Sequence, residues 1–182
     1  MGSLAGDALT DADYNTAVGQ SALTADTMGS RNTAIGRGAL QAQNFTTATN
    51  SQNVAVGYAA GATHTTGLEN TFIGASAGEL ATNPSYTVAV GKSALGGATL
   101  TGSYNTALGR TAGLAMTSGA NNTLVGYASA QAITEGIQNV IVGASAGDAL
   151  TDADYNVVIG MGALSTDTKG NRTTAIGRYA GY

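Results

Sequence analysis

The sequence predicts an all-β fold, a parallel β-solenoid (β-roll) of about ten coils whose repeat period is 17. Three observations support this prediction: one Gly recurs at a fixed spacing, the residues before it favour strands, and the composition suits close backbone packing. Of the 182 residues, 43% are hydrophobic and 10% are charged, with 27 Gly and one Pro. A disordered chain is normally polar and highly charged, so this chain is expected to fold.

The recurring Gly defines the repeat. The spacing between successive copies is 17, except for one spacing of 21 and one of 18. Self-similarity at such a period is the signature of a repeat architecture. Repeat positions are numbered here from this Gly, which is position 0. The copies are Gly19, Gly36, Gly57, Gly74, Gly91, Gly109, Gly126, Gly143, Gly160 and Gly177, and Gly2 opens a partial copy.

The residues before the Gly predict a short strand. Position −1 is always aliphatic, position −3 is always Thr or Val, and position −4 is Asn in eight of ten copies. β-Branched residues favour strands because they pack well on a pleated surface. Segments such as 32–36 are therefore expected to form one strand per coil. The Gly then marks a bend or a close approach of the backbone.

The rest of the repeat is expected to form turns that bring the chain back to the start of the next coil. Position −9 is Thr in eight of ten copies and position −7 is Gly in six. This pattern predicts a turn in which Gly takes unusual dihedral angles and Thr bonds locally. One period of the repeat leaves room for two short strands and two turns. Coils stacked about 4.8 Å apart would form a rod of about 50 Å, with the Asn side chains bonded in a ladder.

The predicted strand is apolar or β-branched on both faces. Alternation places positions −3 and −1 on one side and positions −4 and −2 on the other. Position −2 is Ala in six copies, which suits a narrow interior, although Phe72, Leu124, Ile141 and Val158 are larger. The Val/Ile column at −1 is then expected to face partner chains, because a lone solenoid buries only its inner face. We therefore expect a trimer.

Positions −5 and +1 vary most and hold large polar side chains, so they are expected to face solvent. Their tyrosines are candidate receptor contacts, since Tyr offers sugars or proteins a rigid amphipathic surface. Surface tyrosines also aid solubility and cross-strand pairing, and that explanation stays open. The candidates are Tyr14, Tyr58, Tyr86, Tyr104, Tyr127 and Tyr155.

Composition argues against several other classes of protein. The net charge of −4, with only seven Lys and Arg, makes a nucleic-acid partner unexpected, because phosphate binding needs a basic patch. Without Cys there is neither a disulfide framework nor a thiolate metal site. No apolar run approaches membrane-spanning length, and the first residues do not resemble a signal peptide. Neither membrane insertion nor a cofactor is expected.

Three segments resemble catalytic or nucleotide-binding motifs. Residues 74–78 and 143–147 match the G-x-S-x-G nucleophile motif, but both fall on a column of the repeat itself. His64 is the only His that could act as a base, so no enzymatic activity is expected. Gly91-Lys92-Ser93 resembles the end of a phosphate-binding loop, yet Tyr86 stands where that loop requires its first Gly.

Two further segments resemble ligand sites. His64 lies in the Thr-rich stretch 62–66 and is expected in a solvated turn rather than as a ligand. Residues 11–15 and 152–156 share the pattern D-x-D-x-N with calcium loops, but they lack the Gly and the distal Glu of an EF-hand. Asp and Asn are ordinary turn residues, so solvated turns are expected and no metal site.

The repeat strings resemble those of known fibres. Residues 32–36 (Asn-Thr-Ala-Ile-Gly) and 53–57 (Asn-Val-Ala-Val-Gly), each followed by Ala three residues on, resemble the N-T-A-[IV]-G-x-x-A-[LG] arrays of phage tail fibres. They are also similar to the head repeats of trimeric autotransporter adhesins, whose coils are typically shorter than the period found here. The resemblance covers essentially the whole chain and implies a homotrimeric, left-handed β-roll that projects toward a host surface.

A longer duplication overlies the short repeat. Residues 6–15 recur identically at 147–156, eight coils later. The chain begins and ends inside a repeat without the atypical capping coils that solenoids need. Residues 1–182 are therefore expected to be one repetitive segment of a longer fibre.

These features predict a structural shaft or head segment of a virion tail fibre. It would project toward the host surface, where it could contribute to binding a receptor or glycan. The alternative is the head of a bacterial surface adhesin. An ice-binding solenoid is less favoured, because a flat T-x-T array needs a second Thr column. The expected location is the virion or the cell surface.

Overall fold

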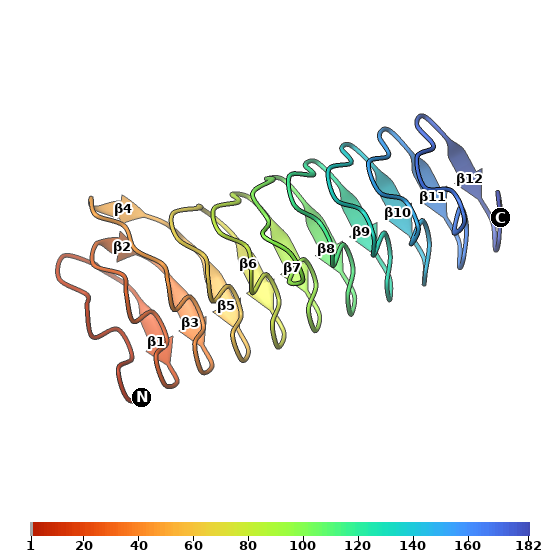
Figure 1. Ribbon diagram of the computed structural model, residues 1–182. Coiled ribbons are helices and arrows are strands. Elements are labelled where there is room, and N and C mark those ends of the chain that lie inside the picture. The colour runs from red at the N-terminus through yellow and green to blue at the C-terminus, as the bar shows by residue number, and fades with distance from the viewer. Residues whose placement is uncertain (1) are drawn as a thin grey trace.

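The structure, a computed structural model, describes residues 2–182 and is a parallel β-solenoid (Figure 1). Ten strands of three residues, one in each coil, form a single sheet along the rod, and residues 2–182 contain no helix. The predicted fold class and period are thus confirmed. The strands are β1 (Thr16–Val18), β3 (Thr33–Ile35), β5 (Val54–Val56), β6 (Thr71–Ile73), β7 (Val88–Val90), β8 (Thr106–Leu108), β9 (Thr123–Val125), β10 (Val140–Val142), β11 (Val157–Ile159) and β12 (Thr174–Ile176).

Adjacent strands pair through identical repeat positions. Thr16 pairs with Thr33 across β1 and β3. Thr33 likewise pairs with Val54 across β3 and β5, although the longest spacing of the repeat separates these two. The four additional residues are therefore accommodated outside the sheet. Because side chains alternate between the two faces of a strand, a register slip of one residue would turn the interior column outward. The repeat keeps every coil in the same register.

One strand per coil was expected, as observed, and the room that the period leaves for a second short strand is used in only a few coils. Only β2 (Gly29–Ser30) and β4 (Thr49–Asn50) pair elsewhere, beside the four-residue insertion (Figure 1), and Ala81 and Leu100 form an isolated bridge. The returning part of each coil instead bends through single residues with left-handed dihedral angles. In one coil these are Tyr86 (φ 56°), Ser93 (φ 56°) and Leu95 (φ 49°).

The repeat Gly is required by a close approach between coils. Its φ lies between 126° and 143° in all ten copies. In nine of them a Cβ would fall within 2.7 Å of the carbonyl oxygen of the next repeat Gly. By contrast, the Gly at position −7 does not take a positive φ, which corrects the expectation of unusual turn dihedrals. Gly67 and Gly119 at this position instead have no room for a Cβ beside the backbone of the next coil.

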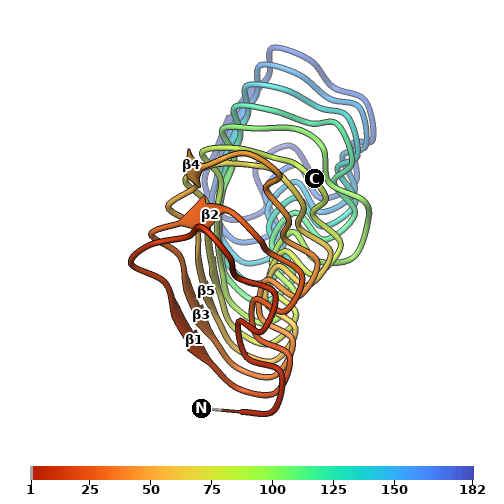
Figure 2. The ribbon, with the colours of Figure 1, turned by 90° about the vertical axis from the view of Figure 1, so that its left-hand side faces the viewer.

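The interior is built from the Ala column and the turn that follows the strand. As expected, Ala34, Ala55, Ala89 and Ala107 at position −2 are fully buried. Figure 2 views the rod obliquely from its N-terminal end, with the strands along one side and the turns returning along the other. Burial of apolar residues on the inner side of every coil gives one continuous core along the rod.

The large side chain of Phe72 in the Ala column fits the interior because the residues that face it are small. Phe72 is fully buried between Gly61 and Gly78, where a Cβ would lie 2.7 Å or less from its ring. Both glycines occupy position +4. In the coil where position −2 is Ala89, position +4 is Leu95 instead. In these two coils close packing therefore pairs a large residue with a small one.

Candidate functional surface

The outer side of the sheet is an exposed surface that runs along the rod. We call it the strand face and define it as positions −5, −3, −1 and +1 of every coil. No side chain at −3 or −1 is buried. Ile35 and Ile73 at position −1 are each 39% exposed, and Leu108 is 48% exposed. The predicted orientation of the Val/Ile column is thus confirmed, and the strand face has an apolar centre.

The two edges of the strand face are aromatic and basic. All residues at −5 and +1 are exposed, as expected, in all ten coils. The six candidate tyrosines lie there, but the structure divides them between the edges. Tyr14, Tyr86, Tyr104 and Tyr155 occupy the −5 edge, and Tyr58 and Tyr127 occupy the +1 edge. They therefore form two discontinuous rows rather than one cluster.

Neighbouring coils pair these side chains along the edges. The rings of Tyr86 and Tyr104 stack with centroids 5.1 Å apart and planes inclined by 9°. Every Arg of the chain has its guanidinium carbon over a Tyr ring, which is the geometry of a cation–π contact. The distances from this carbon to the ring centroid range from 4.8 Å to 5.7 Å. The pairs are Arg31 with Tyr14, Arg37 with Tyr58, Arg110 with Tyr127, Arg172 with Tyr155 and Arg178 with Tyr179.

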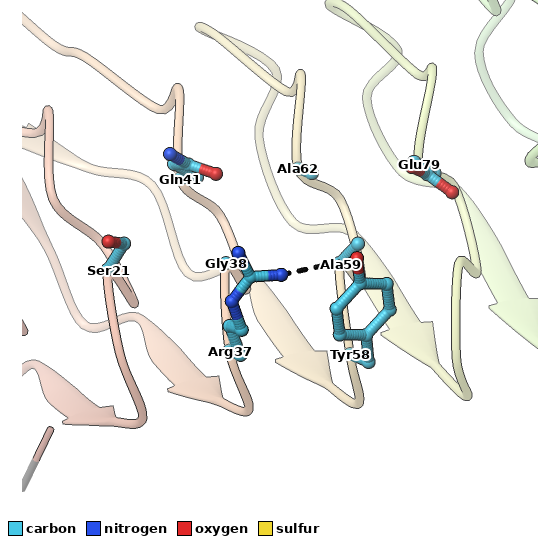
Figure 3. Close-up of a pocket in the computed structure, with 8 residues that line it drawn as sticks. All are labelled: Ser21, Arg37, Gly38, Gln41, Tyr58, Ala59, Ala62 and Glu79. Atoms are coloured by element: carbon cyan, nitrogen blue, oxygen red, sulfur yellow. Dashed lines mark hydrogen bonds between the residues drawn. The ribbon is translucent and has the colours of Figure 1, made fainter.

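A shallow depression of about 180 Å³ opens beside the +1 edge (Figure 3). Arg37 points toward Tyr58, and its Nη1 donates a hydrogen bond to the Tyr58 hydroxyl at 3.3 Å. Gln41, Ala62 and Glu79 line the other side of the depression. Its lining residues come from several successive coils, so the depression lies between the row of side chains at position +1 and the row at position +5.

A ladder of buried Asn side chains lies behind the strands. Asn122 Nδ2 donates to Asn105 Oδ1 at 3.1 Å, and Asn139 Nδ2 donates to Asn122 Oδ1 at 3.0 Å. Each Asn also reaches across to the turn of the next coil, as Asn122 does to the carbonyl of Gly136 at 2.8 Å. The predicted ladder is confirmed for these coils. It satisfies polar groups whose burial without partners would be costly.

The Thr column at position −9 also acts between coils. The hydroxyl of Thr65 donates to the carbonyl of Thr82 at 3.0 Å, and that of Thr151 donates to the carbonyl of Thr168 at 3.0 Å. Local turn bonds were expected from this column. The hydroxyls bond instead to the next coil because stacking brings the same repeat position within reach.

His64 is buried, which overturns the expectation of a solvated turn. Its Nε2 lies 3.0 Å from the carbonyl oxygen of Gly67, and its Nδ1 has no hydrogen-bond partner. Burial lowers the pKa of His64 below its ordinary value of 6.5, because the charged form loses its hydration, while nearby carbonyls oppose the shift. The sequence did not reveal this burial, because Thr-rich neighbours suggested a surface turn.

A polar network connects His64 to the N-terminal coils. Asp26 and Gln43 are fully buried at the same repeat position as His64. Gln43 donates to Asp26 at 2.6 Å and accepts from Asn53 at 2.9 Å. Asn53 accepts from Asn70, whose Nδ2 lies 3.4 Å from His64 Nε2. In three later coils the same position is apolar and buried, with Met116, Ile133 and Leu150.

The other motifs are accounted for by the repeat. Ser76 and Ser145 occupy a left-handed position, with φ of 58° and 50°, and the sole His is engaged with Gly67. Within the D-x-D-x-N segment, Asp154 accepts the backbone N–H of Ile137 at 2.8 Å and links two coils. Lys92 is exposed, as expected.

The described residues, 2–182, offer neither a cluster of metal ligands nor a membrane-spanning helix. No group of three His, Asp or Glu side chains there is placed to hold a metal ion. The same residues form no helix of the length and hydrophobicity needed to span a bilayer.

In comparisons with known proteins, no family model, no curated protein and no solved structure matches the chain.

Proposed function

We propose that this chain is a structural segment of a homotrimeric fibre, best matched by the shaft or head of a phage tail fibre. The observation that carries the proposal is the strand face, whose apolar centre is exposed or half-buried, and never buried, along the ten strands of one chain. Soluble monomers rarely expose apolar patches of this extent. A partner chain is the simplest means of covering it.

The rod-like architecture supports a mechanical role. Each coil bonds to the coils before and after it, so a segment of this kind extends a fibre by about 4.8 Å per coil. A buried Asn ladder and a partly exposed Thr ladder tie successive coils together, as the bonds from Asn122 to Asn105 and from Thr117 to the carbonyl of Thr134 illustrate. These properties suit a spacer that holds a terminal domain away from a surface.

A role without catalysis also fits the chain. The two Ser residues of the G-x-S-x-G segments lie in a column of the repeat, without an adjacent base. The recurring features of the repeat all serve stacking. We therefore propose a structural protein with no enzymatic activity.

The assembly that we propose is a trimer of left-handed β-rolls located on a virion. The repeat strings resemble phage fibre arrays more closely than adhesin heads, because adhesin coils are typically shorter. A bacterial surface adhesin is the second candidate. Tail genes beside the reading frame would favour the phage fibre, whereas a membrane-anchor domain after residue 182 would favour the adhesin.

An ice-binding role has less support. The hydroxyls of the −9 column donate to the next coil, as Thr65 and Thr151 do, and so are not free to order water. On the strand face, position −3 is Thr in some coils and Val in others, such as Val54 and Val88. A thermal-hysteresis measurement should show no activity.

The exposed tyrosines are proposed as secondary contacts for a host receptor or glycan. Their exposed fractions range from 43% for Tyr86 to 79% for Tyr14. Paired Tyr and Arg side chains offer both stacking surface and hydrogen-bond donors. In a trimer the edges of the strand face would border the seams between chains.

Small-angle X-ray scattering tests the proposed architecture. The length should be about 50 Å, as expected for ten stacked coils, and the mass per unit length should correspond to three chains. A rod with the cross-section of one chain would contradict the trimer. A compact particle without rod-like scattering would contradict the fibre segment.

A further inference from the structure

The charged side chains are segregated around the rod. The strand face carries six basic residues and a single acidic one, so its net charge is six minus one, or +5. All five Arg of the chain are among them, and within residues 2–182 none forms an ion pair with a carboxylate. The residues are Arg31, Arg37, Lys92, Arg110, Arg172 and Arg178, with Glu69 as the acidic exception.

A second surface is correspondingly acidic. We call it the acidic side and define it as positions +5 and −8 in the returning part of each coil. Its +5 row borders the strand face across the depression beside the +1 edge, as Glu79 does. Six acidic residues and one Lys give it a net charge of −5, and none of the seven is buried. They are Asp7, Asp11, Glu79, Glu135, Asp148 and Asp152, with Lys169 as the basic exception.

We propose that the strand face of one copy packs on the acidic side of the next copy. This inference rests on the proposed self-association and adds which two surfaces meet. The net charges of +5 and −5 are complementary, and such complementarity selects the partner surface and fixes register. Two strand faces packed against each other would instead bring Arg37 and its equivalents together, and like charges across an interface are costly.

Such a contact joins two different patches and is therefore heterologous. A two-fold dimer uses the same patch on both chains, whereas a heterologous contact builds a ring when the rotation closes. A cyclic trimer is a closed assembly of this kind. Charge segregation therefore favours a ring over a two-fold dimer.

The charges also lie at matching heights along the rod. In a ring without translation, residues at similar heights meet. Asp11 precedes Arg37 by the same number of positions as Asp152 precedes Arg178. The separation in sequence within each Asp–Arg pair corresponds to between one and two coils, or about 5 to 10 Å along the rod axis. A long Arg side chain can span this distance. A matched pair of opposite charges thus lies near each end of the rod.

The area of the strand face is sufficient for a stable contact. The nine steps of about 4.8 Å between ten coils, and the six steps of about 3.3 Å from position −5 to position +1, give a surface of roughly 850 Å². A standard protein interface buries about 800 Å² per partner. An apolar centre with Tyr and Arg at its edges is also the composition expected of an interface.

Charge reversal on each surface, separately and together, tests the proposal. Arg37→Glu with Arg178→Glu lowers the net charge of the strand face from +5 to +1, and Asp11→Lys with Asp152→Lys raises that of the acidic side from −5 to −1. Each pair should weaken association roughly tenfold or more, because it opposes charges that now attract. The chain with all four substitutions restores opposite charges at the two matched pairs, so it should associate more tightly than either pair variant, though less tightly than the wild type, whose surfaces carry larger net charges. Circular dichroism and melting would verify that each variant folds, and Asp13→Lys, outside both surfaces, is the control.

Sedimentation across salt concentrations distinguishes the outcomes. Raising the salt from 0.1 to 1 M shortens the screening length from about 10 to about 3 Å, which should weaken association of the wild type. A wild type that is monomeric throughout overturns the proposed self-association. A wild-type trimer unaffected by either reversal overturns only the pairing of surfaces. The same conclusion follows if the two reversals weaken association but their combination restores none of it.

Discussion

Asn139 Oδ1 accepts two hydrogen bonds from Asn156, one from the backbone N–H and one from the side-chain Nδ2, each 3.0 Å long. Asn139 Nδ2 in turn donates to Ala153 and to Asn122. One side chain therefore holds three coils together and satisfies every one of its own polar groups. Buried networks of this kind are stabilising only when they are complete.

Asn139→Ala should lower the free energy of unfolding by about 2 to 4 kcal/mol. The substitution leaves the backbone N–H of Asn156 and the carbonyl of Ala153 without partners in a buried site, and each such group costs about 1 to 3 kcal/mol. Asn156 Nδ2 keeps its bond to the carbonyl of Gly170. Gln138→Ala is the matched control, because Gln138 is exposed and should change stability by about 0.5 kcal/mol or less. Chemical denaturation of both variants measures the difference. Equal stability would show that the ladder contributes little.

Gly126→Val should destabilise far more than Tyr127→Ser at the adjacent position. A Cβ at Gly126 would overlap the carbonyl of Gly143, and φ at Gly126 is 136°. Backbone strain and overpacking together should cost about 2 to 4 kcal/mol per chain. Tyr127 is 54% exposed, so its replacement should cost about 0.5 to 1 kcal/mol, including the contact with Arg110. Melting both variants checks the order, and equal melting temperatures would refute the assigned register.

The stability of the N-terminal coils should fall as the pH drops below 6.5. The pKa of buried His64 is lowered in the folded chain, so below this pH the unfolded chain binds a proton that the folded chain excludes. The stabilisation is complete above pH 6.5 and is lost as the pH falls toward the folded pKa. Asp26, joined to His64 through Gln43, Asn53 and Asn70, is the acidic group in the same network.

His64→Leu provides the comparison for this pH effect. Leu and Ile fill the same interior position in other coils, as Leu150 and Ile133 do, so the variant should fold. Its unfolding free energy, followed from pH 7.5 to 5, should decline less steeply than that of the wild type. Parallel pH profiles would assign the whole decline to carboxylates and contradict the role given to His64.

The pairing of large and small residues across the interior predicts coupled substitutions. Gly78→Leu alone should clash with the ring of Phe72 and cost about 1 to 3 kcal/mol, and Phe72→Ala alone should cost about 3 to 5 kcal/mol through a cavity. The double variant recreates the combination of Ala89 with Leu95. It should be more stable than the sum of the single effects by at least about 1 kcal/mol. A double-mutant cycle measures the coupling, and strict additivity would contradict it.

Much of the structure of a coil could be predicted because each repeat position occurs in ten copies, which shows the residue types that the position accepts. The buried Ala column and the outward Val/Ile column follow from the period of two within a strand. The bonding of Asn139 to Asn122 follows from the in-register stacking of successive coils. The exposure of Tyr86 and Lys92 followed from the variability of their columns. These features depend on the position within the repeat rather than on the individual residue.

The errors arose where single coils depart from the repeat or where tertiary contacts decide. His64 is buried because its position points inward in every coil, and comparison with Met116 or Ile133 in other coils was the available signal. Left-handed dihedral angles fall on Tyr86 and Leu95 rather than on the Gly of position −7. That Gly is needed because the next coil leaves no space for a Cβ, which the sequence alone does not show.

Sedimentation equilibrium of the wild-type chain is the most direct test of the central claim that the strand face is covered by other copies. The account predicts a single species with three times the chain mass of 17.9 kDa, at micromolar concentration and moderate salt. A stable species of 17.9 kDa that remains soluble would contradict it, because the apolar strand face would then be exposed to water without a partner.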